Sequence, residues 1–200
     1  MKELKKGDIV FDMFAGVGPF SLPAARKGCK VYANDLNPDS YKWLSHNAAL
    51  NKVTANVSAY NKDGRDFARD VIKPELSNLW AAASKQDNDH FSVHVVMNLP
   101  ALAVEFLDVF RGLMVGVSSD NVVLPTVHCY SFSKCDASEL DVQRTAEHIL
   151  GHELPDCRTR VVRKVAPSKD MVCISFQLTS DILSDLKKDE PPTKRLKESD

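Results

Sequence analysis

Short runs of apolar or β-branched residues alternate with segments of helical spacing along most of this chain. Five runs have the character of strands: residues 8–14, 30–35, 56–63, 91–100 and 124–133. Their nearly continuous apolar character favours a parallel sheet covered on both faces. Helical spacing is clearest in two apolar sets, which are Ala103, Phe106, Leu107, Phe110 and Met114, and later Val142, Ala146, Ile149 and Leu150. The alternation predicts a doubly wound, Rossmann-like α/β fold.

Two helix starts are marked by capping residues. Asn37 can cap a helix through its side-chain oxygen. Pro38 suits the first turn of that helix, because a backbone N–H at this position would have no partner within the helix. Asp136 and Glu139 have the spacing of a capping box. Both sites therefore predict that a helix begins there.

The end of the chain departs from the alternation. Residues 158–166 and 170–179 form two strand-like runs joined by residues 167–169, too few for a helix. We therefore predict a hairpin and an antiparallel edge on an otherwise mostly parallel sheet. The charged, proline-containing end predicts one domain over 1–180 and a disordered tail over 181–200. Residues 84–90 form a polar break that predicts a loop.

Composition limits the classes of protein to consider. The 200 residues are 44% hydrophobic, which suits one domain with a sizeable core. Lys and Arg total 26 against 27 Asp and Glu, a net charge of −1, so a nucleic acid would have to bind a local basic patch or parts of a longer protein.

The cysteines and the apolar runs bear on location. Five cysteines without a C-x-x-C pair are typical of reduced thiols. No apolar run approaches the length of a membrane span, and the start lacks the apolar core of a signal peptide. We expect an intracellular monomer that does not bind membranes, in the cytoplasm, the nucleus or the mitochondrial matrix.

The segment "DMFAGVGPF", residues 12–20, predicts a ligand-binding turn. Gly16 and Gly18 permit a tight turn close to a ligand, and Pro19 suits the first turn of a following helix. A dinucleotide fingerprint would continue with glycine at position 21, where Ser21 stands instead. This departure disfavours a nicotinamide or flavin cofactor, although a simple strand-to-helix turn stays an alternative.

Polar residues follow three further predicted strands. Asp35 could accept hydrogen bonds from the ribose hydroxyls of an adenosine, and Asp63 could accept one from its adenine amino group. Asn98 follows the fourth strand, where the reacting centre of such a sheet opens. The three side chains should line one crevice, although each residue could instead serve a turn.

Four motifs, in order, resemble one enzyme family. "DMFAGVGPF", "ANDLNP", "NKDGRDF" and "NLP" with "HCYSF" look like the S-adenosylmethionine-dependent tRNA guanosine-37 N1-methyltransferases of the eukaryotic and archaeal kind. The similarity runs from about residue 7 to 178. It implies a class I methyltransferase fold, in which the hairpin completes a seven-stranded sheet, with S-adenosylmethionine as cofactor and tRNA as substrate.

The resemblance also implies roles for individual residues. The segment from Phe14 through Ala15 and Gly16 to Gly18 would surround the methionine part of the cofactor, with Asp12 beside it. Asp35 and Leu36 would contact the ribose, and Asp63 and Gly64 the adenine. Asn98 would lie between cofactor and target base, on a turn that Pro100 stiffens.

Methylation of guanine N1 also needs a base to remove its proton. In the resembling family, a glutamate and an arginine upstream of the first strand serve the chemistry, and the start "MKELKKGDIV" leaves no room for them. We therefore expect a catalytic core without its upstream tRNA-recognition domains, with weak activity in isolation. Alternatives are a related tRNA-wybutosine aminocarboxypropyl transferase and a non-catalytic RNA-binding or partner-binding module.

Several other groups of residues allow more than one interpretation. Arg158, Arg160, Arg163 and Lys164, with Lys169, could bind phosphates or simply form an exposed face of the hairpin. Tyr41 and Trp43 are expected to pack rather than to stack on bases. His148 and His152 have a helical metal-ligand spacing, but no third ligand is evident, so we expect no metal.

Overall fold

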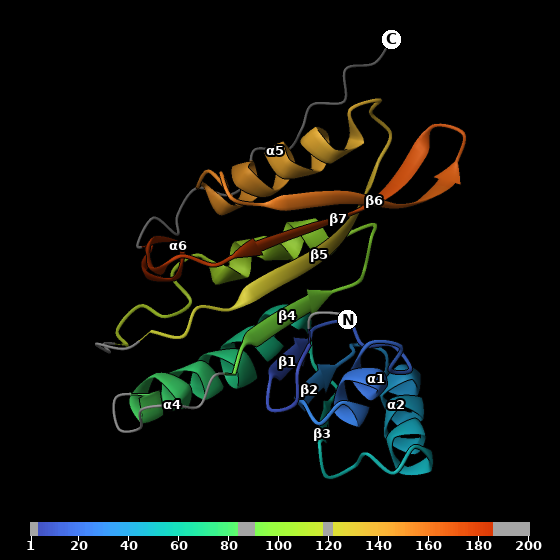
Figure 1. The fold of residues 1–200 in the computed structure, drawn as a ribbon, viewed down its shortest axis with the longest axis vertical. Helices are drawn as coiled ribbons and strands as arrows, with labels where there is room; N and C mark the ends of the chain where they lie inside the picture. The colour runs from blue at the N-terminus through green and yellow to red at the C-terminus, as the bar shows by residue number, and fades with distance from the viewer. Residues whose placement is uncertain (1–3, 84–90, 118–121, 186–200) are drawn as a thin grey trace.

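A mixed sheet of seven strands forms the centre of the computed structural model, which describes residues 4–83, 91–117 and 122–185 (Figure 1). The strand order is β3-β2-β1-β4-β5-β7-β6. The strands are β1 (Ile9–Asp12), β2 (Lys30–Asn34), β3 (Val57–Tyr60), β4 (Val93–Met97), β5 (Thr126–Ser133), β6 (Arg158–Ala166) and β7 (Lys169–Gln177). All seven predicted strands are present, most of them shorter than the apolar runs.

The sheet is parallel from β3 to β5 and antiparallel at its other end. β1 lies between β2 and β4, and β4 pairs with β5, all in parallel. β7 pairs antiparallel with both β5 and β6. The prediction of a parallel sheet completed by a hairpin is confirmed. Because the chain crosses over between β1 and β4, their carboxyl ends border the crevice in which ligands of such sheets bind.

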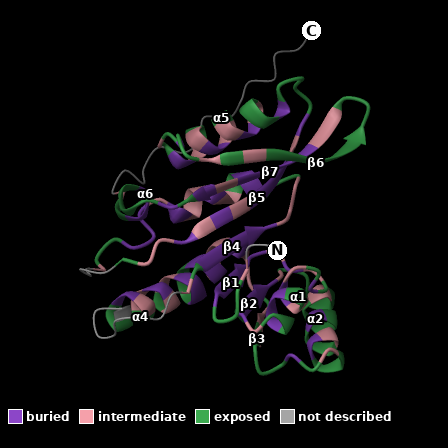
Figure 2. Cartoon of the chain, in the orientation of Figure 1, coloured by how far each residue is buried: buried purple, intermediate pink, exposed green. Residues whose placement is uncertain are grey.

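Helices cover the two faces unequally. α1 (Ser21–Arg26) and α2 (Pro38–Leu50) lie on one face, over the β1–β3 half of the sheet. The other face carries α3 (Gly64–Phe67), the π-helix η1 (Ala68–Ile72), α4 (Lys73–Ala83), the 3₁₀ helix η2 (Ala103–Phe110) and α5 (Ser138–Leu150). The larger apolar core lies under this second set, and the buried strands run through the centre of Figure 2. A smaller cluster of Tyr130, Met171 and Cys173 lies on the α1 side of β5 and β7.

One predicted cap is confirmed and the other is wrong. The Asn37 side chain accepts from the backbone N–H of Asp39, with Pro38 in the first turn of α2. α5 begins at Ser138, and no described side chain caps it. Glu139 is exposed, and the Ser138 hydroxyl donates to Asp170 of β7 instead (3.1 Å). A tertiary hydrogen bond thus holds the helix start that the capping box was expected to hold.

The prediction of a helix over residues 103–114 is partly wrong. The structure forms the short 3₁₀ helix η2, and Met114 lies beyond its end. η2 ends at Phe110, and the chain leaves the helical conformation at Arg111, whose ψ is 116°. The N–H of the next residue, Gly112 with a φ of +62°, donates to the Ile182 carbonyl (2.8 Å). The Met114 N–H donates to the Leu183 carbonyl (2.8 Å). Bonds to a distant segment therefore replace those that would continue the helix.

The predicted tail begins too early. α6 (Ser180–Ser184) crosses the expected boundary, and Ile182 and Leu183 are fully buried in the larger core. Ile182 and Leu183 alone, in a charged sequence, give too weak an apolar periodicity to predict α6. The predicted loop at 84–90 and the rest of the predicted tail, 186–200, lie outside the described residues.

The cysteines are all free thiols. Cys29, Cys129 and Cys173 are buried, as expected of small core residues, whereas Cys135 is exposed and Cys157 is half-buried. Across the described ranges, none of the helices is long and apolar enough to cross a bilayer.

Candidate functional site

The loop between β1 and α1 needs glycine at position 18. Gly16 and Gly18 have φ values of +54° and +99°. A Cβ on Gly18 would lie 2.7 Å from Cγ of Leu22 and 3.0 Å from Cδ1 of Leu44. Both backbone angle and space therefore require glycine there. α1 begins at Ser21, two residues after Pro19. Pro19 lies within the turn that the Leu22 N–H closes on the Gly18 carbonyl (3.0 Å), so it occupies the turn that leads into the helix.

Asp35 fastens this loop to the start of α2. Its Oδ2 accepts the Gly16 N–H (2.8 Å), and its Oδ1 accepts the Asn37 N–H (2.9 Å). The carboxylate is half-buried, and the neighbouring Leu36 is 66% exposed. Each carboxylate oxygen can accept a further hydrogen bond, so the site keeps capacity for two ligand hydroxyls.

We expect Asp35→Ala to weaken binding of an adenosine-containing cofactor by about 1.5–3 kcal/mol, because charge-assisted hydrogen bonds are lost. Calorimetric titration with S-adenosylmethionine measures the change. Asp39→Ala removes an exposed carboxylate four residues away and serves as the control. An affinity equal to that of the unmodified chain would exclude a ribose contact at Asp35.

Asp12, at the end of β1, is a fully buried acid. The Ser21 hydroxyl donates to its Oδ2 (2.7 Å), and Oδ1 has no hydrogen-bond partner among the described residues. Burial raises the pKa of Asp12 from 3.8 to about 7, against the lowering effect of the Ser21 hydrogen bond. Ser21 stands where a dinucleotide fingerprint has its third glycine. Its hydroxyl binds the buried carboxyl group of Asp12, beneath the loop between β1 and α1.

Asn98 follows β4 and also carries an unpaired acceptor. Its Oδ1 is buried and lacks a hydrogen-bond partner within the described part of the chain. The turn that presents Asn98 is fixed to β5, because the Phe132 N–H donates to the Pro100 carbonyl (2.9 Å). Asp12 pairs in register with Val96, and Asn98 follows the end of β4 two residues later, so both residues lie at the carboxyl ends of the adjacent strands β1 and β4. Two buried, unpaired acceptors at the crossover indicate a polar ligand.

The turn after β3 has a structural role of its own. Oδ1 of Asp63 accepts the Arg65 N–H (2.8 Å) and caps α3. Gly64 is buried, and a Cβ there would lie 3.0 Å from the Phe14 ring and 3.1 Å from the Phe106 ring. The turn interpretation of Asp63 is therefore correct, and a contact to adenine stays a prediction.

The expected site residues come together at one edge of the sheet. The glycine loop, Asp35, Asp63 and Asn98 follow β1, β2, β3 and β4, whose carboxyl ends are adjacent in the sheet. Sequence reasoning missed Ser21 as a partner of Asp12, and it treated Phe106 as a core residue. The apolar spacing that contains Phe106 could not show that this residue is only half-buried.

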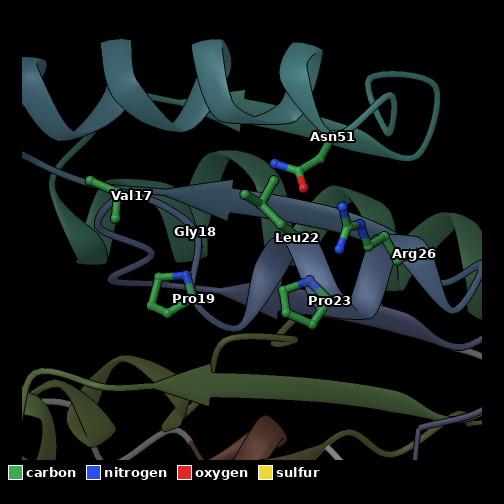
Figure 3. Close-up of a pocket in the computed structure, with 7 residues that line it drawn as sticks. All are labelled: Val17, Gly18, Pro19, Leu22, Pro23, Arg26 and Asn51. Atoms are coloured by element: carbon green, nitrogen blue, oxygen red, sulfur yellow. The ribbon is translucent and has the colours of Figure 1, made fainter.

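A shallow groove of about 240 Å³ lies beside the glycine loop, between α1 and the end of α2 (Figure 3). Its lining is Val17, Gly18, Pro19, Leu22, Pro23, Arg26 and Asn51. It is mostly apolar and lacks Asp35, Asp63 and Asn98. We therefore do not assign a nucleoside cofactor to this groove.

The basic residues of β6 are exposed at the edge of the sheet. Arg158, Arg160 and Arg163 are in register with Ser175, Cys173 and Met171 of β7, so they share one face despite irregular pairing after Val161. Lys164 is also exposed. The prediction of an exposed strip is confirmed, and its binding to phosphates stays a prediction.

The remaining expectations concern the aromatic residues of α2 and a metal site. Trp43 is 53% exposed and Tyr41 36%, because α2 buries Leu44 and Ala48 instead. The Trp43 ring packs edge-on against the His46 ring (5.4 Å) on the surface of the helix, so its expected packing role is met outside the core. His152 lies 3.4 Å from Asp185. Across residues 4–83, 91–117 and 122–185, no group of three or more His, Cys, Asp or Glu side chains could hold a metal ion.

Comparisons with known proteins agree with this geometry. Residues 1–150 match the model of the TRM5/TYW2 methyltransferase domain. A tRNA (guanine(37)-N(1))-methyltransferase of Xenopus tropicalis is 54% identical over 194 residues, covering 96% of this chain and 39% of that protein. The chain thus spans about two fifths of that relative's length.

Solved structures show the same fold. Trm5b from Pyrococcus abyssi has a TM-score of 0.57 at 28% identity, covering 88% of this chain and 46% of that one. Methanocaldococcus jannaschii Trm5 in complex with adenosine has a TM-score of 0.56 at 25% identity, covering 89% and 46%. The domain match and the sequence identity together show that the chain belongs to the TRM5/TYW2 methyltransferase domain family.

Proposed function

We propose that this chain is the catalytic domain of an S-adenosylmethionine-dependent enzyme that methylates N1 of guanosine 37 in tRNA. The observation that carries the proposal is the 54% identity, across nearly the whole chain, to a relative named for that reaction. The unpaired acceptors of Asp12 and Asn98 at the β1/β4 crossover support it, because they mark the place for a polar ligand.

The residues at the crossover suit this cofactor. The glycine loop would lie along its methionine part, Asp35 would accept from the ribose hydroxyls, and the Asp63–Gly64 turn would meet the adenine. The buried Asp12 carboxyl would offer an acceptor beneath the loop. When bound, the cofactor supplies an activated methyl group on sulfur, and the chain's task is to hold the acceptor nitrogen in line with it.

Asn98 would position the target base. Its amide can donate to one atom of a base edge and accept from another, and the hydrogen bond from the Phe132 N–H to the Pro100 carbonyl keeps its turn in place. Guanine N1 carries a proton, so transfer also needs a general base.

The basic strip on β6 would contact the RNA backbone. Arg158, Arg160 and Arg163 lie on the same face as Tyr130 and Phe132 of β5. Lys169 lies over the Phe132 ring (4.0 Å), and Phe132 is bonded to the turn that follows Asn98. Tyr130 is buried in the small cluster with Met171 and Cys173, so Lys169 and the half-buried Phe132 ring are the groups that lie between the strip and the candidate site. A basic side chain beside an aromatic ring suits contact with single-stranded RNA.

Methylation assays test the function. A longer form of the protein, of the length of its relatives, is incubated with S-adenosylmethionine and tRNA that carries G or A at position 37, and the nucleoside product is identified by mass spectrometry. We expect 1-methylguanosine from the G37 tRNA and no product from the A37 tRNA. An aminocarboxypropyl product would favour the wybutosine branch of the family, and cofactor binding without any product would favour a non-catalytic module.

The same assay tests the strip. Replacing Arg158 and Arg160 together by alanine should raise the KM for tRNA and weaken its dependence on salt, because fewer phosphates are neutralised. Replacing Lys42 and Lys52, exposed at α2 and the turn after it, is the control. An unchanged KM in the arginine variant would remove the strip from the RNA contact surface.

A further inference from the structure

Two histidines lie side by side on the face of the sheet that carries α1. His94 of β4 is in register with Val10, which packs in the core beneath α1, and His128 belongs to the neighbouring strand β5. The His94 Nδ1 lies 3.1 Å from the His128 Nε2, with ring planes 21° apart. His94 is buried and His128 half-buried. The separation is that of a hydrogen bond, so one ring donates to the other.

Each end of this pair meets another polar side chain. The Ser175 Oγ of β7 lies 2.9 Å from the His128 Nδ1. The buried Asp8, just before β1, has its Oδ2 3.7 Å from the His94 Nε2. Two backbone N–H groups, at 2.7 and 2.9 Å, hold the Asp8 carboxylate in place. A line of four polar side chains therefore crosses the sheet from the start of β1 to β7.

The hydrogen bonds along this line determine where the ring protons are. A neutral imidazole has one N–H and one acceptor nitrogen. When both rings are neutral, the Ser175 hydroxyl donates to His128, His128 donates from Nε2 to His94, and His94 directs its Nε2–H toward Asp8. The opposite order would direct a bare Nε2 lone pair of His94 toward a carboxylate, so the first order is favoured.

The pair has room for one extra proton. A proton added to His94 gives an imidazolium whose Nδ1–H donates to His128 and whose Nε2–H faces Asp8. His128 then accepts at Nε2, carries its own proton on Nδ1 and donates to Ser175, so every hydrogen bond is kept with its direction reversed. A second proton would set two N–H groups against each other across 3.1 Å and put two positive charges side by side.

Charged neighbours favour His94 over His128 as the site of the extra proton. Asp8 lies beside His94, whereas Arg158 of β6 is in register with Ser175, on the side of His128. A positive charge is therefore stabilised at the Asp8 end of the line and opposed at the Arg158 end.

Other titratable groups next to the line are thiols, a phenol and an exposed ammonium group. Burial raises the pKa of Tyr130 to about 12 and the pKa of Cys29 above its usual value, so both side chains stay neutral. The buried Cys173 has its Sγ 3.8 Å from the Ser175 Oγ. Lys27, at the end of α1, is exposed. Asp8 therefore remains the negative charge that faces the two rings.

We propose that the His94–His128 pair takes up a single proton in the folded chain as the pH falls, that His94 carries the charge beside Asp8, and that the hydrogen bond to Ser175 reverses. The inference goes beyond methyl transfer and does not rest on it, because the line lies outside the candidate site. The reversal changes Ser175 from a donor into an acceptor, and Ser175 is in register with Arg158 of the basic strip. A proton bound at the start of β1 thus alters the hydrogen bonding beside that strip.

Nitrogen NMR of the imidazoles tests the inference. Long-range ¹H–¹⁵N spectra of the ¹⁵N-labelled chain are recorded from about pH 8.5 to about pH 5.5, a range that spans the titration of ordinary histidines. The signals are assigned with His94→Gln and His128→Gln. We expect His94 to change from one N–H to two, while His128 stays neutral and its proton moves from Nε2 to Nδ1. The exposed His148 of α5 is the internal control and should simply become doubly protonated.

A matched pair of variants tests the role of Asp8. Asp8→Asn removes the negative charge beside His94 and keeps an acceptor, so proton uptake should need a lower pH. Asp136→Asn removes the same charge from an exposed residue beyond the other end of β5 and should leave the transition where it is. The spectra of the unmodified chain decide the inference even if Asp8→Asn fails to fold.

Three results would overturn the inference. Two rings that stay neutral down to the pH at which the chain unfolds would make the line a static part of the sheet. Two doubly protonated rings in the folded chain would exclude the limit of one proton. A charge on His128, or a His128 proton that remains on Nε2, would exclude the assignment to His94 and the reversal at Ser175.

Discussion

Asn98→Ala in a longer, active form of the protein is expected to lower turnover by about two to three orders of magnitude and to leave cofactor affinity within a few fold. A preorganised hydrogen-bonding group at a reacting centre is typically worth that factor. The structural reason is the buried, unpaired Oδ1 of Asn98 on a turn that is fastened to β5. Single-turnover methylation of tRNA and calorimetry with S-adenosylmethionine measure the two quantities separately.

Two variants sharpen this prediction. Asn98→Asp keeps the shape and one acceptor but removes the amide donor, so a loss close to that of alanine would assign the effect to donation. Asn78→Ala changes an exposed asparagine of α4 and should leave both quantities unchanged. Weak cofactor binding with normal turnover of the bound complex would assign Asn98 to the cofactor instead of the base.

Asp12→Asn is expected to stabilise the isolated chain at neutral pH and above. Because burial raises the pKa of Asp12 from 3.8 to about 7, the folded chain keeps a proton that the unfolded chain has released. The free energy of unfolding therefore falls as pH rises between these values. The difference between the two pKa values corresponds to a loss of about 4 kcal/mol in the free energy of unfolding. The loss is complete once Asp12 is ionised in the folded state as well.

Urea unfolding of the two proteins from pH 4 to pH 8 measures this effect. The stability advantage of Asp12→Asn should grow with pH up to about 7 and then level off. Ser21→Ala removes the hydrogen bond that favours the charged carboxylate, so the levelling should move to higher pH. A difference in stability that is the same at every pH would contradict the assignment of a buried, titrating acid.

Parallel strands and their polar ends could be predicted from the sequence because both depend on local order. Continuous apolar runs specify buried strands, and the residue after such a run must lie at the carboxyl edge of the sheet. Asp35, Asp63 and Asn98 are therefore found at adjacent strand ends, as predicted. The Asn37 cap was predictable for the same reason, since its hydrogen bond reaches only two residues along the chain.

Features that depend on distant partners were decided by the tertiary structure alone. After η2 ends at Phe110, the N–H of Gly112 bonds the Ile182 carbonyl instead of continuing the helix, and α6 is ordered because Ile182 and Leu183 are buried in the main core. A short apolar pair carries no periodicity from which such burial can be predicted.

The same limit applies within the candidate site. The glycine pattern and Ser21 identified a loop, but only the fold buries Asp12 beneath that loop and thereby raises its pKa. Phe106 fits a helical apolar pattern, yet it is only half-buried, at the edge of the core, where it packs against Phe14 and Arg65 beside Gly64. Sequence order determined which residues reach the site, whereas burial and contacts across the sheet determined their charge and exposure, because both depend on neighbours far away in the chain.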